Sequence, residues 1–166
     1  MYMITIAIIG LGSNVALGEG SSSDLVRLLT KSFFDRGLKI TAQSDLWRSK
    51  AWPDPTQPEY LNGVFVVETQ LSATALMATL LEIEQKFGRE RSVPNAPRTL
   101  DLDLIAYGNE VIDEPDLTVP HPRAADRRFV MGPLSQVAPS WVHPVLGKTA
   151  LALFEAATVG LDAHPV

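Results

Sequence analysis

The sequence predicts an α+β fold in which a sheet carries helices on one face and leaves the other face open for a ligand. Segments that alternate or are continuously apolar, typical of strands, are interspersed with two segments whose apolar residues recur every three to four positions, typical of amphipathic helices. Their order is strand, helix, strand, strand, helix, strand, so two β-α-β halves are joined by a hairpin. This is the ferredoxin-like βαββαβ sandwich, here with an added hairpin and C-terminal helices.

The first β-α-β half spans residues 3–48. Residues 3–11 are β-branched and apolar, which favours a strand buried on both faces near the centre of the sheet. Serines at 21–23 and Asp24 offer N-caps for a helix that Gly37 ends at its C′ position. Alternation then returns from Leu38 to Arg48, which predicts the second strand.

The second half begins after residues 49–59, whose three prolines predict a loop. Residues 60–71 alternate and predict the third strand, with Tyr60 and Asn62 on one face. Ser72 caps a second helix, in which Leu76, Leu80, Ile83 and Phe87 form one stripe before Gly88.

An acidic strand at 99–106 follows the charged loop 89–98. Successive side chains of a strand point to opposite faces, so Asp101 and Asp103 share one face while the neighbouring leucines share the other. Carboxylates about 7 Å apart along a strand can hold a hard divalent cation between them. A strand with charged outward positions is more often simply solvated, so the D-x-D pattern by itself is a weak signal.

The C-terminal region adds elements to this core. Gly108-Asn109 is a turn signal, which predicts that residues 110–112 pair back as a short hairpin. A short helix begins at Pro122, and a proline interrupts the apolar segment at 129–137. Residues 149–158 are expected to form the last helix.

The length and composition indicate one domain, residues 1–166, that is large enough to fold without covalent cross-links. The absence of cysteine excludes disulfides, thiolate chemistry and Cys-ligated zinc. The apolar start at 4–11 is too short to span a bilayer, and a net charge of −5 argues against a general nucleic-acid or anionic-membrane surface. We therefore expect a cytoplasmic monomer that binds neither nucleic acid nor membranes. Arginines gathered in the second half suggest a small polyanion such as a nucleotide. They are Arg89, Arg91, Arg98, Arg123, Arg127 and Arg128.

Five motifs occur in a fixed order along the chain. They are Gly12-Ser13-Asn14, Gln57-Pro58-Glu59-Tyr60-Leu61-Asn62, Glu84-x-x-x-Gly88-Arg89-x-Arg91, Pro97-Arg98-Thr99-Leu100-Asp101-Leu102-Asp103 and Leu117-Thr118-Val119-Pro120-His121. With this order and spacing, the chain closely resembles the 6-hydroxymethyl-7,8-dihydropterin pyrophosphokinases of the folate pathway, from about residue 4 to about residue 140.

The resemblance implies transfer of the terminal pyrophosphate of ATP to the hydroxymethyl group of a reduced pterin, with release of AMP and participation of two Mg²⁺ ions. Asp101 and Asp103 resemble the metal ligands of the family. Such an in-line displacement at phosphorus depends on charge neutralisation and positioning more than on a covalent nucleophile. By the same resemblance, the residues expected to act on the phosphates are Arg89, Arg98, Arg127 and His121.

The resemblance also assigns residues to the two substrates. Those expected to bind ATP are Glu84, Arg89, Arg91, Arg98, Leu104, Thr118, His121 and Arg127. Those expected to bind the pterin are Ser49, Ala51, Trp52, Tyr60, Asn62 and Phe129. A flat, amide-rich heterocycle favours aromatic faces together with polar groups at its rim, and the amide of Asn62 can both donate and accept.

Three departures from the family pattern concern the loops. Loop 89–98 is about one residue short, and Pro94-Asn95-Ala96 stands where a tryptophan and a glycine commonly precede the Pro-Arg pair. Residues 50–53 replace a segment that usually bears proline and glycine, and Pro122 follows His121 where an aromatic residue is often found. We expect retained activity with altered loop closure.

Two other functions remain as alternatives. A non-catalytic ferredoxin-like module that binds a nucleotide or a pterin would use the same scaffold, but it has no need to keep the two aspartates, the arginines and His121 together. A D-x-D nucleotide-sugar transferase is disfavoured because the chain lacks room for separate nucleotide and acceptor domains.

Overall fold

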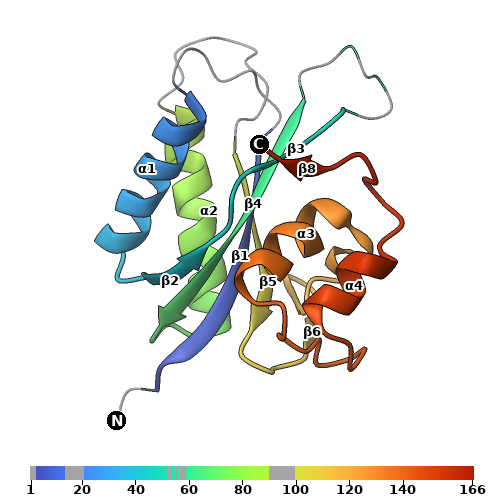
Figure 1. Cartoon of the computed structure of the whole chain (residues 1–166). Coiled ribbons are helices and arrows are strands. Elements are labelled where there is room, and N and C mark those ends of the chain that lie inside the picture. The colour runs from blue at the N-terminus through green and yellow to red at the C-terminus, as the bar shows by residue number, and fades with distance from the viewer. Residues whose placement is uncertain (1–2, 14–20, 52–53, 55, 57–58, 90–99) are drawn as a thin grey trace.

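The computed structural model describes residues 3–13, 21–51, 54, 56, 59–89 and 100–166 (Figure 1). The strands are β1 (Thr5–Ser13), β2 (Lys39–Gln43), β3 (Trp47–Ser49), β4 (Tyr60–Thr69), β5 (Asp101–Tyr107), β6 (Ile112–Glu114), β7 (Leu117–Val119) and β8 (His164–Pro165). The helices are α1 (Ser21–Asp35), α2 (Ala73–Arg89), a 3₁₀ turn at Ala124–Asp126, α3 (Arg128–Val137) and α4 (Ala150–Ala156).

The main sheet has the strand order β5-β1-β4-β3-β8, and β2 also pairs with β4. Every pairing in it is antiparallel. The connections β1-α1-β2 and β4-α2-β5 are the two β-α-β halves, and each places its two strands apart in the sheet. The predicted ferredoxin-like βαββαβ arrangement is therefore confirmed.

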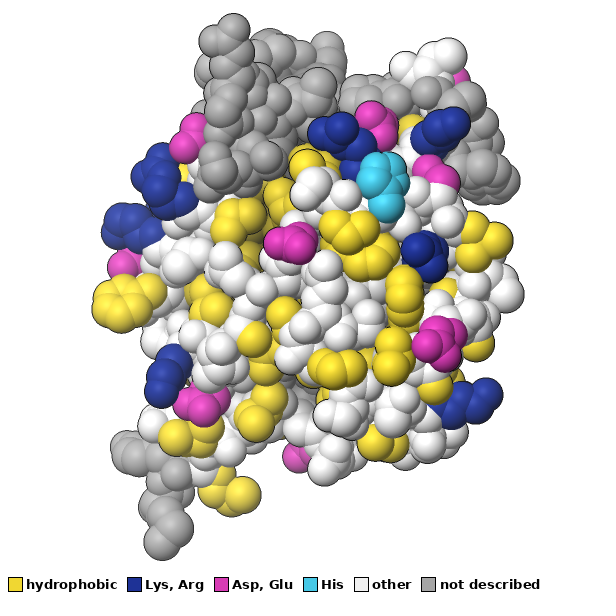
Figure 2. Space-filling model, in the orientation of Figure 1, with side chains coloured by type: hydrophobic (Ala, Val, Ile, Leu, Met, Phe, Trp, Pro, Cys, Tyr) yellow, Lys and Arg dark blue, Asp and Glu magenta, His cyan; other side chains and the backbone are white. Residues whose placement is uncertain are grey.

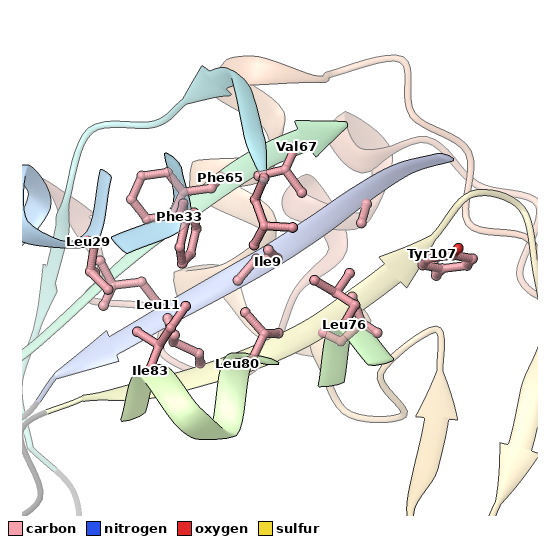
Figure 3. Close-up of a cluster of buried hydrophobic side chains, with 14 of the residues drawn as sticks. Ile9, Leu11, Leu29, Phe33, Phe65, Val67, Leu76, Leu80, Ile83 and Tyr107 are labelled. Atoms are coloured by element: carbon pink, nitrogen blue, oxygen red, sulfur yellow. The ribbon is translucent and has the colours of Figure 1, made fainter. Parts of the chain in front are cut away.

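Helices α1 and α2 cover one face of the sheet, and the larger core lies between them and the strands (Figures 1 and 3). Ile9 and Leu11 of β1 point into this core together with Phe33 of α1 and Leu80 of α2. Phe33 meets Phe65 of β4 edge-on, with ring centroids 5.2 Å apart. The predicted helix stripes and strand faces thus bury their apolar sides against one another, which is the dominant stabilising contribution in such a fold.

The opposite face is not open along its whole length, contrary to our expectation. Helices α3 and α4 pack against it and form a second apolar core, which includes Ile8 of β1, Val64 of β4 and Met131 of α3 (Figure 1). The close approach of α3 to β3 depends on Gly132 of the helix, because a Cβ there would lie 2.6 Å from the ring of Trp47. The sheet is consequently covered by helices on both sides, and only part of the second face is left for a ligand.

Four local expectations were wrong. The predicted strand at 38–48 is divided into β2 and β3, which both pair with β4. The segment after Gly108 does not pair with the acidic strand, since β6 pairs with β7 in a separate two-stranded sheet. Pro133 lies inside α3 instead of interrupting it. Finally, β8 was not expected at all, because two residues carry no periodic signal.

The described residues include no helix that is both long and apolar enough to cross a bilayer.

Candidate active site

A cavity of about 1020 Å³ lies over the part of the second sheet face that α3 leaves uncovered. Its floor comes from β1, β4 and β5, and its walls come from the N-terminal end of α3, the residues after β3 and the segment that follows α4. Figure 2 shows acidic, basic and histidine side chains gathered at the upper end of the molecule, beside the residues drawn in grey. Figure 1 places the end of β1 and the beginning of β5 at this same end.

The cavity floor is organised by two glycines of the central strand β1. Gly12 pairs with Asn62 on one side and with Asp101 on the other. Gly10 stands in the next row on the same face, beside Asp103. Neighbouring strands are about 4.8 Å apart, so Asn62 and Asp101 face each other across roughly 10 Å of glycine backbone. The missing side chains make room for a flat ligand between the amide and the carboxylate.

The acidic strand β5 lies at the edge of the sheet, and two hydrogen bonds along its outer side hold it. The carboxylate of Glu84 on α2 accepts from the backbone N–H of Leu102, with an Oε1 to N distance of 2.5 Å. The backbone N–H of His121 donates to the carbonyl of Ile105 at 2.8 Å. The first bond fixes the peptide between Asp101 and Asp103, and the second brings His121 to the same edge.

Asp101 and Asp103 both line the cavity, as the alternation of β5 requires. The described residues contain no group of three or more His, Cys, Asp or Glu side chains that could hold a metal ion. Two carboxylates without further protein ligands suit Mg²⁺, which is usually bound by one or two carboxylates with phosphate and water oxygens completing the shell. The donor set therefore fits the ions that the resemblance implies.

His121 lies between the acidic strand and two arginines. Burial lowers its pKa below the ordinary 6.5, and the positive charges of Arg127 and Arg123 lower it further, while the Asp103 carboxylate acts in the opposite direction. The ring Nδ1 accepts the backbone N–H of Arg123 at 3.2 Å. In the neutral ring the proton is consequently on Nε2, which leaves the ring one N–H donor.

The residues expected to bind the pterin converge on the other end of the cavity. Ser49, Ala51, Tyr60, Asn62 and Phe129 all line it, although they come from β3 and the residues after it, from β4 and from α3. The Nδ2 atom of Asn62 donates to the carbonyl of Leu11 at 3.4 Å, a long contact that orients the amide. The guanidinium of Arg127 lies 5.7 Å from the centre of the Phe129 ring.

Other predicted site residues lie elsewhere. The Leu104 side chain is buried in the larger core on the opposite face, and Glu84 holds the backbone of β5. Thr118 is exposed on β7 and does not line the cavity. The side chain of Arg89 falls outside the described residues, and so do Arg91, Arg98, Trp52 and the whole of loop 90–99. The departure at Pro94-Asn95-Ala96 lies outside them for the same reason, whereas Lys50, Ala51 and Pro122 of the other two departures are described.

Sequence reasoning missed two parts of the cavity. Residues 158–162, after the last helix, form one wall, and Lys50 lies at the rim. Nothing in their pattern signalled this, because the segment has no motif. The role of Ser13 was also missed: it lines the cavity, and its hydroxyl is buried with no hydrogen-bond partner among the described residues.

Residues 8–139 match the family described as 7,8-dihydro-6-hydroxymethylpterin-pyrophosphokinase. The chain belongs to this pyrophosphokinase family. Among relatives, a 2-amino-4-hydroxy-6-hydroxymethyldihydropteridine pyrophosphokinase from Synechocystis is 42% identical over 149 residues, which cover 90% of this chain and 74% of the relative. A protein of the same name from Campylobacter jejuni is 36% identical over 132 residues, covering 80% of this chain and 82% of the relative.

A solved structure of the Plasmodium falciparum HPPK-DHPS triple mutant resembles the fold with a TM-score of 0.71 at 13% identity. The match covers 99% of this chain but only 48% of the Plasmodium falciparum chain. The pyrophosphokinase family and the fold class predicted from the sequence are therefore confirmed. The predicted enzyme class and reaction, an ATP-dependent pyrophosphoryl transfer to hydroxymethyldihydropterin in folate synthesis, agree with the family and with the names of its members.

Proposed function

We propose that the chain transfers the terminal pyrophosphoryl group of ATP to the hydroxymethyl group of 6-hydroxymethyl-7,8-dihydropterin in folate biosynthesis. The hydroxyl oxygen attacks the β-phosphorus of ATP, the bond from that phosphorus to the α-β bridging oxygen breaks, and AMP leaves. The observation that carries the proposal is the shared cavity floor, in which the carboxylates of Asp101 and Asp103 face the amide of Asn62 across the backbone of β1.

The metal sites of this proposal are Asp101 and Asp103, with two Mg²⁺ ions as the expected complement. When bound, Mg²⁺ supplies charge neutralisation on the triphosphate oxygens. The chain's own contribution is to hold both carboxylates on one face of a strand whose edge is fixed by Glu84. This arrangement needs no protein nucleophile.

At the phosphate end, Arg127 and His121 supply donors to the transferred group. The guanidinium of Arg127 presents a planar fork to phosphate oxygens, and the neutral His121 donates from Nε2. The proposal extends to Arg89 and Arg98, which the family resemblance assigns to the same phosphates, and to Arg91 as a further ATP contact.

At the acceptor end, the pterin lies on the glycine floor beside Asn62. Phe129 offers an aromatic face and Tyr60 shares the strand face of Asn62, while Ser49 and Ala51 form the rim. Trp52 is proposed as a second stacking residue.

The remaining proposals concern the state of the protein in the cell. We propose a cytoplasmic monomer with no nucleic-acid or membrane partner. The net charge of −5 supports the last part of this proposal, because nucleic acid and anionic membranes attract basic surfaces.

The experiment is a nucleotide assay with ATP, Mg²⁺ and the reduced pterin. We expect equimolar AMP and pterin diphosphate, and no AMP when the pterin is omitted. Formation of ADP, or the absence of nucleotide turnover, would overturn the proposal. Binding of ATP or pterin without turnover would instead identify the non-catalytic module.

A further inference from the structure

The segment Thr158–Val166, called the C-terminal clasp below, lies beyond residues 8–139 that match the family. It leaves α4 after Ala156, passes along the cavity and ends as β8 at the edge of the main sheet (Figure 1). Five consecutive residues of the clasp, 158–162, line the cavity. The clasp is therefore in a position to shape the acceptor pocket.

The beginning of the clasp is bound to the chain that enters α3. Both carboxylate oxygens of Asp126 accept from the Thr158 hydroxyl at 2.8 Å. The backbone N–H of Val159 donates to the carbonyl of Asp126 at 3.1 Å, and the carbonyl of Val159 accepts from Arg128 at 2.9 Å. The backbone is thus hydrogen-bonded once before Arg127, at Asp126, and once after it, at Arg128. These two bonds fix the backbone immediately before Phe129.

Gly160 lies directly against the Phe129 ring. A Cβ at this position would be 2.5 Å from Cδ1 and 2.9 Å from Cε1 of the ring, which is closer than atoms can approach. The backbone of Gly160 also has φ +74°, a conformation that other residues rarely adopt. Only glycine allows the clasp to support the ring here, so the position of the ring depends on this residue.

The end of the clasp holds the opposite wall. The Oδ2 atom of Asp162 accepts from the backbone N–H of Lys50 at 2.7 Å, between Ser49 and Ala51 of the pterin rim. The carbonyl of Ala163 accepts from Nε of Arg128 at 2.9 Å, and β8 pairs with β3. One short segment therefore connects the wall that carries Phe129 with the wall that carries the rim.

We propose that the C-terminal clasp sets the width of the pterin pocket, with Gly160 and Asp162 as positioning residues that act through Phe129 and the Ser49–Ala51 rim. The inference rests on the proposed function, because the pterin is the ligand whose fit the clasp controls. It assigns no part of ATP binding to the clasp.

The test is Gly160→Ala, with Gly147→Ala as its matched control. Gly147 has a similar positive φ of 67° but open space where a Cβ would be, and it does not line the cavity. Both substitutions thus introduce the same backbone strain, and only the first displaces Phe129. We expect the pterin KM at saturating ATP and Mg²⁺ to rise roughly tenfold or more in Gly160→Ala, since displacements near 1 Å can cost up to ~10²-fold.

The ATP KM should stay near the wild-type value in both variants. Equal pterin KM values in Gly160→Ala and Gly147→Ala would overturn the inference. The wild-type enzyme serves to separate the two proposals: if it releases no AMP, the proposed function fails, whereas normal wild-type turnover with an unaffected Gly160→Ala variant refutes the clasp alone.

A second pair of variants covers the case in which Gly160→Ala does not fold. Asp162→Ala removes the acceptor for Lys50, whereas Asp162→Asn keeps a side-chain oxygen that can accept the same N–H. We expect the pterin KM to rise in Asp162→Ala and to recover in Asp162→Asn. Identical pterin KM values for Asp162→Ala and the wild type would contradict the proposal.

Discussion

The carboxylate of Glu84 accepts the backbone N–H of Leu102, the residue between Asp101 and Asp103, at 2.5 Å. Family resemblance assigns Glu84 to ATP, but its side chain holds the strand that carries the proposed metal ligands. A charged acceptor is suited to this position, because hydrogen bonds to charged groups contribute about 1.5–3 kcal/mol.

We expect Glu84→Ala to lower the free energy of unfolding by about 1.5–3 kcal/mol, because the N–H of Leu102 loses its partner. Turnover should fall on the order of 10-fold to 100-fold as the carboxylates move. Glu84→Gln keeps an oxygen acceptor, so its free energy of unfolding and its turnover should both lie between those of the wild type and of Glu84→Ala. Chemical denaturation measures the change in stability, and AMP release measures the change in turnover. A Glu84→Ala variant with wild-type stability would show that the hydrogen bond has no structural role.

Asp103→Asn should lower turnover by about 10²–10³-fold while leaving the melting temperature unchanged or raised. Removing one of two like charges relieves their repulsion in the metal-free protein, so stability need not fall. Magnesium titration followed by AMP release measures the loss. Asp113→Asn on the exposed hairpin strand β6 is the matched control and should behave as wild type. A large loss of stability in Asp103→Asn would instead indicate a structural carboxylate.

Gly12→Ala should weaken pterin binding without harming the fold. The new methyl group would lie on the cavity floor, 3.2 Å from Nδ2 of Asn62, and would narrow the space between that amide and Asp101. Alanine is intrinsically more favourable than glycine in a strand by roughly 0.5–1 kcal/mol, which offsets the tight contact. We expect a pterin KM raised roughly tenfold, equivalent to about 1.4 kcal/mol.

Gly10→Ala is the comparison for this variant. Its methyl group would meet the flexible end of Ile105, at 3.2 Å, instead of the Asn62 amide that is proposed to orient the pterin. The effect on the pterin KM should therefore be smaller than in Gly12→Ala. Equal effects would mean that the amide of Asn62 is not the group displaced.

The stability of the protein should decrease in mild acid through His143. Its Nδ1 accepts the backbone N–H groups of Val145 and Leu146 at 3.1 and 3.0 Å, and burial lowers its pKa below 6.5. Because the folded-state pKa is the lower one, the unfolded chain takes up a proton first as the pH falls. Stability is therefore lost from about pH 6.5 downward through the folded-state pKa.

We expect His143→Asn to weaken this pH dependence. An asparagine oxygen can accept the backbone N–H two residues ahead, as in an Asx turn, but it does not titrate. The measurement is the melting temperature between pH 7.5 and pH 5 for both proteins, and the contribution of His121 is common to the two. Parallel curves would exclude His143 as a source of the acid sensitivity.

The sequence predicts those parts of the site that strand alternation controls. Asp101 and Asp103 share one face of β5, and Tyr60 and Asn62 share one face of β4, because side chains of a strand alternate with a period of two. The order of strands and helices was likewise sufficient for the ferredoxin-like fold. These features depend on residues that are close together in the chain, so they can be predicted from local sequence patterns.

Features that depend on contacts between distant segments were not predictable. The wall formed by residues 158–162 depends on Asp126, Phe129 and Lys50, which are far away in sequence. The same reason explains the hairpin error: Gly108 signals a turn correctly, but the strand after it finds its partner in β7. A short strand takes whichever partner tertiary packing offers.

The covering of the sheet edges has a consequence for solubility. Exposed edge strands invite pairing with another molecule and are starting points for aggregation. On one side of this sheet, the outward N–H of Leu102 and the outward carbonyl of Ile105 are already occupied by Glu84 and His121. The other side is divided between β8, which is only two residues long, and β2, which pairs with β4 alone among the described strands. The contacts that hold β5 for its proposed role thus also protect that edge from strand addition by a second molecule.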